Sequence, residues 1–197
     1  MSKGVNISHV PVAYIELEVR DKNGKLIKKH RQPAHSWVKN FMNILRYGFA
    51  NHDVPCTKQD GSTVSITINA SLGWFLRVTA GAGDDSHGLM VGNGSKAFEV
   101  DDYSLDSKIP HGSNANQLVY GETTVENVVD DGSKLYFRII RTFSNNSGSS
   151  ITVTEVGLAV AGADNKPLIA RDVLDSPVTV PNGGTLTVRY IIQYQYA

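Results

Sequence analysis

The sequence predicts a mainly β fold, an antiparallel β-sandwich or a jelly-roll-like arrangement, with one helix packed on it. The prediction rests on short segments in which apolar and polar residues alternate, because a period of two is typical of strands with one buried face. Turn residues separate these segments at intervals of roughly eight to twelve positions, which is typical of sandwiches. No repeat, low-complexity tract or linker divides the 197 residues, so we expect a single domain over residues 1–197.

The clearest alternation lies in residues 134–143, and a second apolar segment follows in residues 151–160 after the polar turn 145–149. We predict that the two segments form a long hairpin at the centre of a sheet. The apolar positions of the second segment change parity near Thr154 and Glu155. This change indicates either a bulge at that point or a strand that is buried on both faces.

The chain starts its regular structure with a predicted hairpin of residues 10–20 and 26–31. Residues 21–24, Asp-Lys-Asn-Gly, join the two segments, and Asn-Gly between such segments is a strong signal for a tight hairpin turn. The second segment carries Lys28 and Lys29, which suits an edge strand because lysines discourage unwanted pairing.

Residues 36–47 have the period of a helix. Ser36 is a good N-cap, and Gly48 is placed to end the helix. The apolar stripe consists of Trp37, Val38, Phe41, Ile44 and Leu45. We expect this stripe to pack on one end or one face of the sheet, and contact with a partner protein is the alternative.

The rest of the chain is read as further strands and one long connection. The strands are predicted at residues 64–68, 74–79, 89–91, 117–120, 123–129, 167–174, 177–180 and 185–196. The connection, residues 96–116, has few apolar residues and no regular period, and a loop this long is usually functional or ordered by a neighbour. We predict that it is ordered by contacts in an assembly and is protease-sensitive in the free protein. The candidate assembly contacts are Val100, Asp101, Asp102, Tyr103, Leu105, Ile109 and His111.

The composition argues against several classes of function. Lys and Arg together number 19, as do Asp and Glu, and the formal charge of zero argues against a general nucleic-acid binder. Cys56 is the sole cysteine, so no internal disulfide or cysteine-rich zinc site is possible. No apolar stretch resembles a signal peptide or a membrane span, so we expect synthesis in a cytoplasm and no membrane contact.

The sequence contains no motif that indicates catalysis. The glycine-rich turns at 81–83 and 92–94 are not phosphate loops, because no strand–loop–helix unit surrounds either. Cys56 has no neighbouring base motif, and none of the six histidines belongs to a His-Glu-x-x-His pair. Pairs of aspartates occur at 84–85, 101–102 and 130–131. They leave calcium binding as an alternative, although they lack the spacing of a calcium loop. We expect no catalytic residue, no cofactor and no metal ion.

Eight segments carry a resemblance to a known family. They are residues 35–41, 91–97, 100–106, 109–112, 141–148, 151–158, 168–174 and 178–188. Together they resemble uncharacterised virion structural proteins of tailed bacteriophages. The resemblance implies a β-rich accessory subunit that oligomerises on the particle, as a capsid decoration or cement protein or as a neck or tail component. It also implies that the partners are copies of itself and major capsid, neck or tail proteins, assembled into the virion in the host bacterial cytoplasm.

A carbohydrate- or receptor-binding module on a viral fibre is the alternative, with a host-surface glycan as the partner. Exposed aromatic side chains at Trp74, Tyr103 or Tyr120 would distinguish this alternative. An enzyme would instead require convergent carboxylates or histidines in one cleft.

Overall fold

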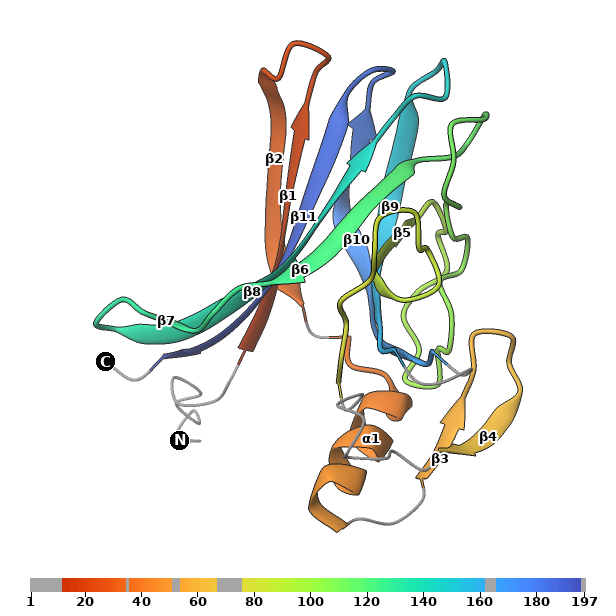
Figure 1. Ribbon diagram of the computed structural model, residues 1–197, viewed down its shortest axis with the longest axis vertical. Coiled ribbons are helices and arrows are strands. Elements are labelled where there is room, and N and C mark those ends of the chain that lie inside the picture. Colours follow the sequence, from red (N-terminus) through yellow and green to blue (C-terminus); the bar gives the residue numbers. More distant parts are fainter. Residues whose placement is uncertain (1–11, 35, 51–53, 67–75, 162–165, 196–197) are drawn as a thin grey trace, which may run out of the picture.

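The computed structural model describes residues 12–34, 36–50, 54–66, 76–161 and 166–195, which form two packed sheets, a small hairpin and a helix (Figure 1). The strands are β1 (Val12–Arg20), β2 (Leu26–Ala34), β3 (Val54–Thr57), β4 (Thr63–Ile66), β5 (Gly88–Gly92), β6 (Val119–Val125), β7 (Val129–Asp130), β8 (Lys134–Ser144), β9 (Ile151–Ala159), β10 (Leu168–Val180) and β11 (Thr185–Gln195), and the helix is α1 (Lys39–Ala50). The larger sheet has the order β2-β1-β11-β8-β6, with β7 paired to β8, and the smaller sheet has the order β10-β9-β5. The described part of the chain therefore confirms the predicted mainly β fold with one helix.

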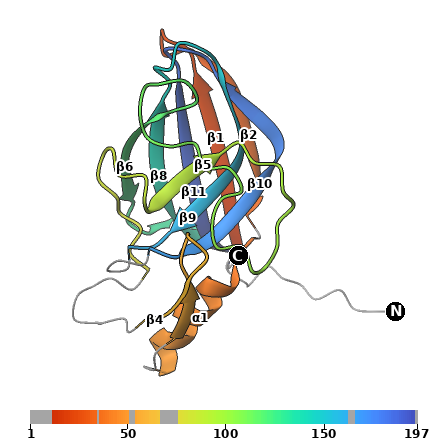
Figure 2. The ribbon, with the colours of Figure 1, turned by 90° about the vertical axis from the view of Figure 1, so that its right-hand side faces the viewer.

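The core lies between the two sheets, which Figure 2 shows face to face. In β1, Ala13, Ile15, Leu17 and Val19 are buried and alternate with partly exposed residues, as expected for a strand with one face on the core. Full burial of a large apolar side chain is worth about 1.5–3 kcal/mol before conformational entropy is subtracted. The layer between the sheets therefore supplies most of the stabilisation of the fold.

The predicted hairpin of residues 134–143 and 151–160 is wrong. Strand β8 lies between β11 and β6 in the larger sheet, whereas β9 lies between β10 and β5 in the smaller one, so the connecting turn crosses between sheets. Asn145 holds this crossing, because its buried side-chain amide donates to the carbonyls of Ser149 and Val180, both at 2.8 Å. Each strand turns an apolar face to the core, and alternation alone does not say which sheet a strand joins.

The expected irregularity in the second apolar segment is present, but the extra residues lie in its partner strand. Glu155 pairs with Val173 and Val153 pairs with Val178, so residues of β10 between these pairs bulge out of the ladder. The C-terminal half of β9 is buried on both faces, which was the other expectation. Because β9 is the middle strand of its sheet, it has no edge in contact with solvent.

The predicted first hairpin is confirmed. Strands β1 and β2 pair around a turn in which the Asp21 carboxylate accepts the backbone N–H groups of Asn23 and Lys25. Gly24 has a φ of 79°, a conformation that favours glycine because a Cβ would be strained there. Strand β2 is an edge of the larger sheet, as the lysines predict.

Helix α1 begins at Lys39 and not at residue 36, because the preceding residues run along β10. The carbonyl of Ser36 accepts the N–H of Arg171 at 3.1 Å, and the N–H of Val38 donates to the carbonyl of Ile169 at 3.1 Å. Ser36 is therefore not the N-cap. These strand-like bonds attach the start of the helix to the smaller sheet, and α1 packs against β10 and β3.

Other predicted strands differ in their limits. Of residues 74–79, the first two lie outside the described residues and the others form no strand. The segment 64–68 appears as β4, and its last two residues also lie outside the described part. Residues 167–174 and 177–180 are one bulged strand, β10.

Candidate functional site

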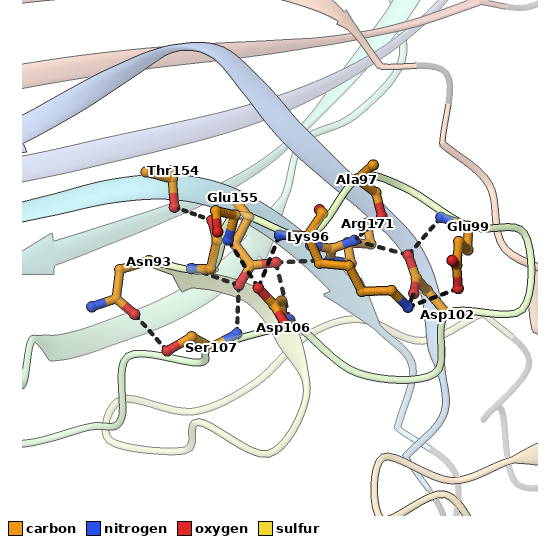
Figure 3. Close-up of polar contacts among 12 residues, drawn as sticks. Asn93, Lys96, Ala97, Glu99, Asp102, Asp106, Ser107, Thr154, Glu155 and Arg171 are labelled. Atoms are coloured by element: carbon orange, nitrogen blue, oxygen red, sulfur yellow. Dashed lines mark hydrogen bonds and ion pairs between the residues drawn. The ribbon is translucent and has the colours of Figure 1, made fainter.

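A buried polar cluster attaches the long loop between β5 and β6 to the sandwich (Figure 3). Its centre is Glu155 of β9, whose side chain is fully buried. One carboxylate oxygen, Oε1, accepts the N–H groups of Gly94 at 3.2 Å and Ser107 at 2.8 Å. The other, Oε2, accepts the N–H of Asp106 at 3.1 Å. Three backbone donors from two parts of the loop, Gly94 and residues 106–107, thus converge on one carboxylate.

Arg171 of β10 neutralises Glu155 and also reaches the loop. Its Nε donates to Glu155 at 2.7 Å, and its Nη1 donates to Asp102 at 2.9 Å. The remaining donors bind the carbonyls of Ala97 at 3.3 Å and Lys96 at 2.8 Å. Buried charges are tolerated when they are paired and their other polar atoms are hydrogen-bonded, and both conditions hold for Arg171.

Asp102 completes the cluster from the loop side. Burial alone would raise the pKa of this carboxyl, but the N–H of Glu99 at 2.9 Å, the Lys96 ammonium at 3.0 Å and Arg171 outweigh burial and lower the pKa. A lowered pKa in the folded state means that the ionised carboxylate stabilises the fold above the unfolded pKa of about 3.9. That stabilisation is lost as the pH falls from there through the lower folded value.

The predicted assembly contacts fall into two groups, according to whether the structure exposes or buries them. The exposed residues are Val100, Asp101 and Tyr103, and the internal residues are Asp102, Leu105, Ile109 and the half-buried His111. The three buried members of the internal group are not available to a partner in this fold. Its members fix the loop instead, as His111 shows by accepting the N–H of Tyr120 at 3.1 Å. Because one chain fixes the loop by itself, we now expect the free protein to resist proteolysis there, which reverses the expectation from the sequence.

Gly92, at the end of β5, marks a point where the cluster leaves no room for a side chain. A Cβ at Gly92 would clash with Oε1 of Glu155 and lie 2.6 Å from the carbonyl oxygen of Ser107. We expect Gly92→Ala to lower the free energy of unfolding by about 1–3 kcal/mol, measured by urea denaturation. Gly81→Ala is the control, because its Cβ would meet nothing within 4 Å. Equal midpoints for the two variants would show that the cluster adapts without cost.

The larger sheet continues into an arm, residues 125–136, that projects beyond the smaller sheet (Figure 1). Its exposed apolar side chains are Val125 at 44%, Val128 at 64%, Val129 at 36% and Leu135 at 37%. Leu135 has the parity of Phe137 and Ile139, so it lies on the core-facing side of β8. It is exposed because no second layer formed by the described residues reaches the arm.

An apolar hollow of about 210 Å³ lies beside the arm. Its lining comes from the larger sheet, from Trp37 and Phe41 around the start of α1, from residues 76–79, and from Leu158 and Ile169 of the smaller sheet. We define the uncovered strip as the exposed Val125 and Leu135 together with the half-buried Trp37, Phe41, Phe137 and Ile192 that adjoin them. The strip is continuous, because Phe137 pairs with Ile192 and the Trp37 and Phe41 rings stack with centroids 4.2 Å apart. Sequence periodicity predicts that Leu135 and Phe137 face the core. It does not indicate that the smaller sheet ends before it reaches these residues.

The residues considered for chemistry or sugar stacking are placed as follows. Among the described residues, no group of three or more His, Cys, Asp or Glu side chains is placed to hold a metal ion. Burial raises the pKa of the Cys56 thiol to about 11, which keeps the thiol protonated at neutral pH. Tyr120 is buried and donates to the carbonyl of Ile109 at 2.6 Å, whereas Tyr103 is exposed. Trp74 lies outside the described residues.

Comparison of the chain with models of protein families, with curated proteins and with solved structures found no match. No helix in the described part of the chain has the length and apolar character to span a membrane. The described residues form a β-sandwich whose larger sheet they cover only in part. The uncovered strip is the candidate contact surface.

Proposed function

We propose that this chain is a structural accessory subunit of a tailed-phage virion that binds neighbouring proteins through the uncovered strip. One observation carries the assembly role: the larger sheet extends its core-facing side past the layer that covers it. Continuous exposed apolar surface marks interaction sites. The phage assignment is supported by the resemblance of the segments from Ala34 onward to virion structural proteins. Capsid, neck and tail are the candidate positions, with further copies and other virion proteins as partners.

The size of the strip sets the strength of a single contact. Val125 and Leu135 are already more than half buried, so covering each contributes about 1 kcal/mol, a fraction of the value for full burial. Association itself costs at least about 4 kcal/mol in lost motional freedom. One contact between free subunits is therefore weak, and many copies bound to one particle are needed for firm attachment.

Leu135→Lys is expected to weaken self-association of the purified protein about tenfold or more, because it places a charge in the apolar contact. Sedimentation velocity over a concentration series measures this. Leu26→Lys is the matched control, since Leu26 is an exposed leucine, at 42%, at the start of β2 and outside the strip. Because the contact between free subunits is weak, the series extends to the highest concentration at which the chain stays dissolved. An equal effect of Leu26→Lys, or no association of the wild type even at that concentration, would count against contact between copies through the strip.

The phage assignment is tested separately on intact particles. Mass spectrometry of purified particles is expected to find the protein in many copies, and electron cryomicroscopy of particles lacking it should show missing density. Loss of shell resistance to heat or chelator would indicate a capsid cement protein, whereas loss of tails or of adsorption would indicate a tail component. Absence of the protein from purified particles would refute the assignment.

A further inference from the structure

The opposite, outer face of the larger sheet carries a second feature. Figure 1 shows the arm leaning away from β1 and β2. On the outer face, residues of the arm and of these strands line an open hollow of about 380 Å³, within the range of ligand sites. It is lined by Glu16, Arg31, Asp131, Lys134, Tyr136, Arg138, Ile191 and Gln193. These residues come from β1, β2, β8 and β11 and the turn before β8, so the hollow is supported mainly by paired strands.

The hollow combines one aromatic side chain with polar groups of both signs. Tyr136 is half-buried in the sheet, and Gln193 is its cross-strand partner. The Lys134 ammonium and the Arg138 guanidinium lie 5.8 Å and 5.7 Å from the centroid of the Tyr136 ring. An aromatic ring beside carboxylate, amide and cationic groups offers apolar surface together with several hydrogen-bonding groups.

Most charges in the hollow are already paired. Lys134 binds Asp131 at 3.0 Å, and Arg138 binds Glu126 at 2.6 Å. Arg31 differs, because no described carboxylate lies within ion-pair distance of its guanidinium, which lies 4.1 Å above the ring of Tyr14. Stacking on an aromatic ring holds a guanidinium in a defined orientation while its N–H groups stay free to bind an anion. Arg31 is thus the cation in the hollow whose N–H groups remain free to bind a ligand.

We propose that this hollow binds an acidic saccharide. Tyr136 supplies the surface on which the apolar side of a sugar ring packs, and Glu16 and Gln193 supply acceptors and donors for hydroxyl groups. Arg31 receives the acidic group, since a guanidinium binds a carboxylate through two parallel hydrogen bonds. A nucleic acid fits less well, because two carboxylates line the hollow and the chain has no net charge. The site lies on the face opposite the uncovered strip and goes beyond the assembly role.

The test is binding of the purified full chain to an array of acidic and neutral oligosaccharides, followed by titration calorimetry with the strongest binder. Acidic oligosaccharides are expected to bind, and their neutral analogues are not. Arg31→Ala and Tyr136→Ala should each weaken binding about tenfold or more, whereas Arg20→Ala and Tyr103→Ala should change it less than about twofold.

Arg31 is exposed, so Arg31→Ala is expected to fold normally, and its thermal unfolding is recorded alongside the wild type. Leu135→Lys should bind the saccharide as well as wild type does, because Leu135 faces the other side of the sheet. The saccharide-binding test therefore does not depend on the outcome of the self-association test. Absence of binding to every acidic oligosaccharide, or undiminished binding by Arg31→Ala, would overturn the proposal.

Discussion

Arg171→Leu is expected to lower the free energy of unfolding by about 3–5 kcal/mol. The substitution leaves the carboxylates of Glu155 and Asp102 buried without their shared cation. It also removes the donors to two loop carbonyls, those of Lys96 and Ala97. Removing one member of a buried pair costs more than the pair contributes, because the remaining charge stays desolvated.

Urea denaturation measures the loss, with Arg20→Leu as the control. Arg20 belongs to the larger sheet but is 44% exposed in its side chain, and it lies 3.6 Å from Glu18, so its replacement should cost less than about 1 kcal/mol. Limited proteolysis is the second readout, because we expect new cuts within residues 96–108 in the Arg171 variant alone. Similar midpoints for both variants would show that the cluster does not hold the loop.

Replacing both Glu155 and Arg171 by methionine is not expected to restore stability. Many buried ion pairs tolerate exchange for apolar residues of similar volume. Here the carboxylate also accepts three backbone N–H groups of the loop, from Gly94, Asp106 and Ser107. An apolar replacement leaves these buried donors unpaired, and each unpaired donor costs about 1–3 kcal/mol.

Arg141→Leu is the second substitution with a large expected effect, a loss of about 3–5 kcal/mol. Arg141 of β8 is fully buried, and its guanidinium lies 4.7 Å from the centroid of the Tyr120 ring. Its donors bind the carbonyls of Gly81, Asp84, His87, Leu89 and Gly121 at 2.5–3.2 Å. The bonds to His87 and Leu89 are buried, so leucine would leave those carbonyls without partners or water.

Arg141→Lys separates the charge from the shape of the side chain. Lysine keeps the cation near the Tyr120 ring but cannot donate to carbonyls on several sides at once. We expect its midpoint in urea to fall between those of the wild type and the leucine variant. Hydrogen exchange of amides in residues 81–89 should increase most in the leucine variant. A leucine variant with a wild-type midpoint would show that other contacts hold this segment.

Much of the fold follows from local patterns. The period of two predicts the core-facing side chains of β1 correctly, and Asn-Gly predicts the first turn. The prediction of a hairpin from residues 134–143 and 151–160 is wrong because a turn of this composition can either join neighbouring strands or cross between sheets. The buried amide of Asn145 decides between them, and burial is a property of the folded chain.

The candidate sites were less predictable. The loop between β5 and β6 includes the predicted connection of residues 96–116, but the sequence places Asp102 among the assembly contacts, whereas the structure buries it beside Arg171. At Glu155 the sequence shows only a change of parity, and nothing there indicates that this residue binds the loop. Both residues gain their roles from partners on other strands and loops, which no local pattern identifies.

The sequence by itself determined that the chain forms short antiparallel strands, which apolar side chains of strands such as β1 face the core, and that one helix and one long loop interrupt the strands. Only the tertiary structure decided which sheet each strand joins, that Arg171 and Glu155 fix the loop, and that the arm extends past its covering layer. The reason is physical. Periodicity and turn chemistry act over a few residues, whereas strand pairing, the burial of one sheet by the other and the neutralisation of buried charges depend on residues far apart in the chain.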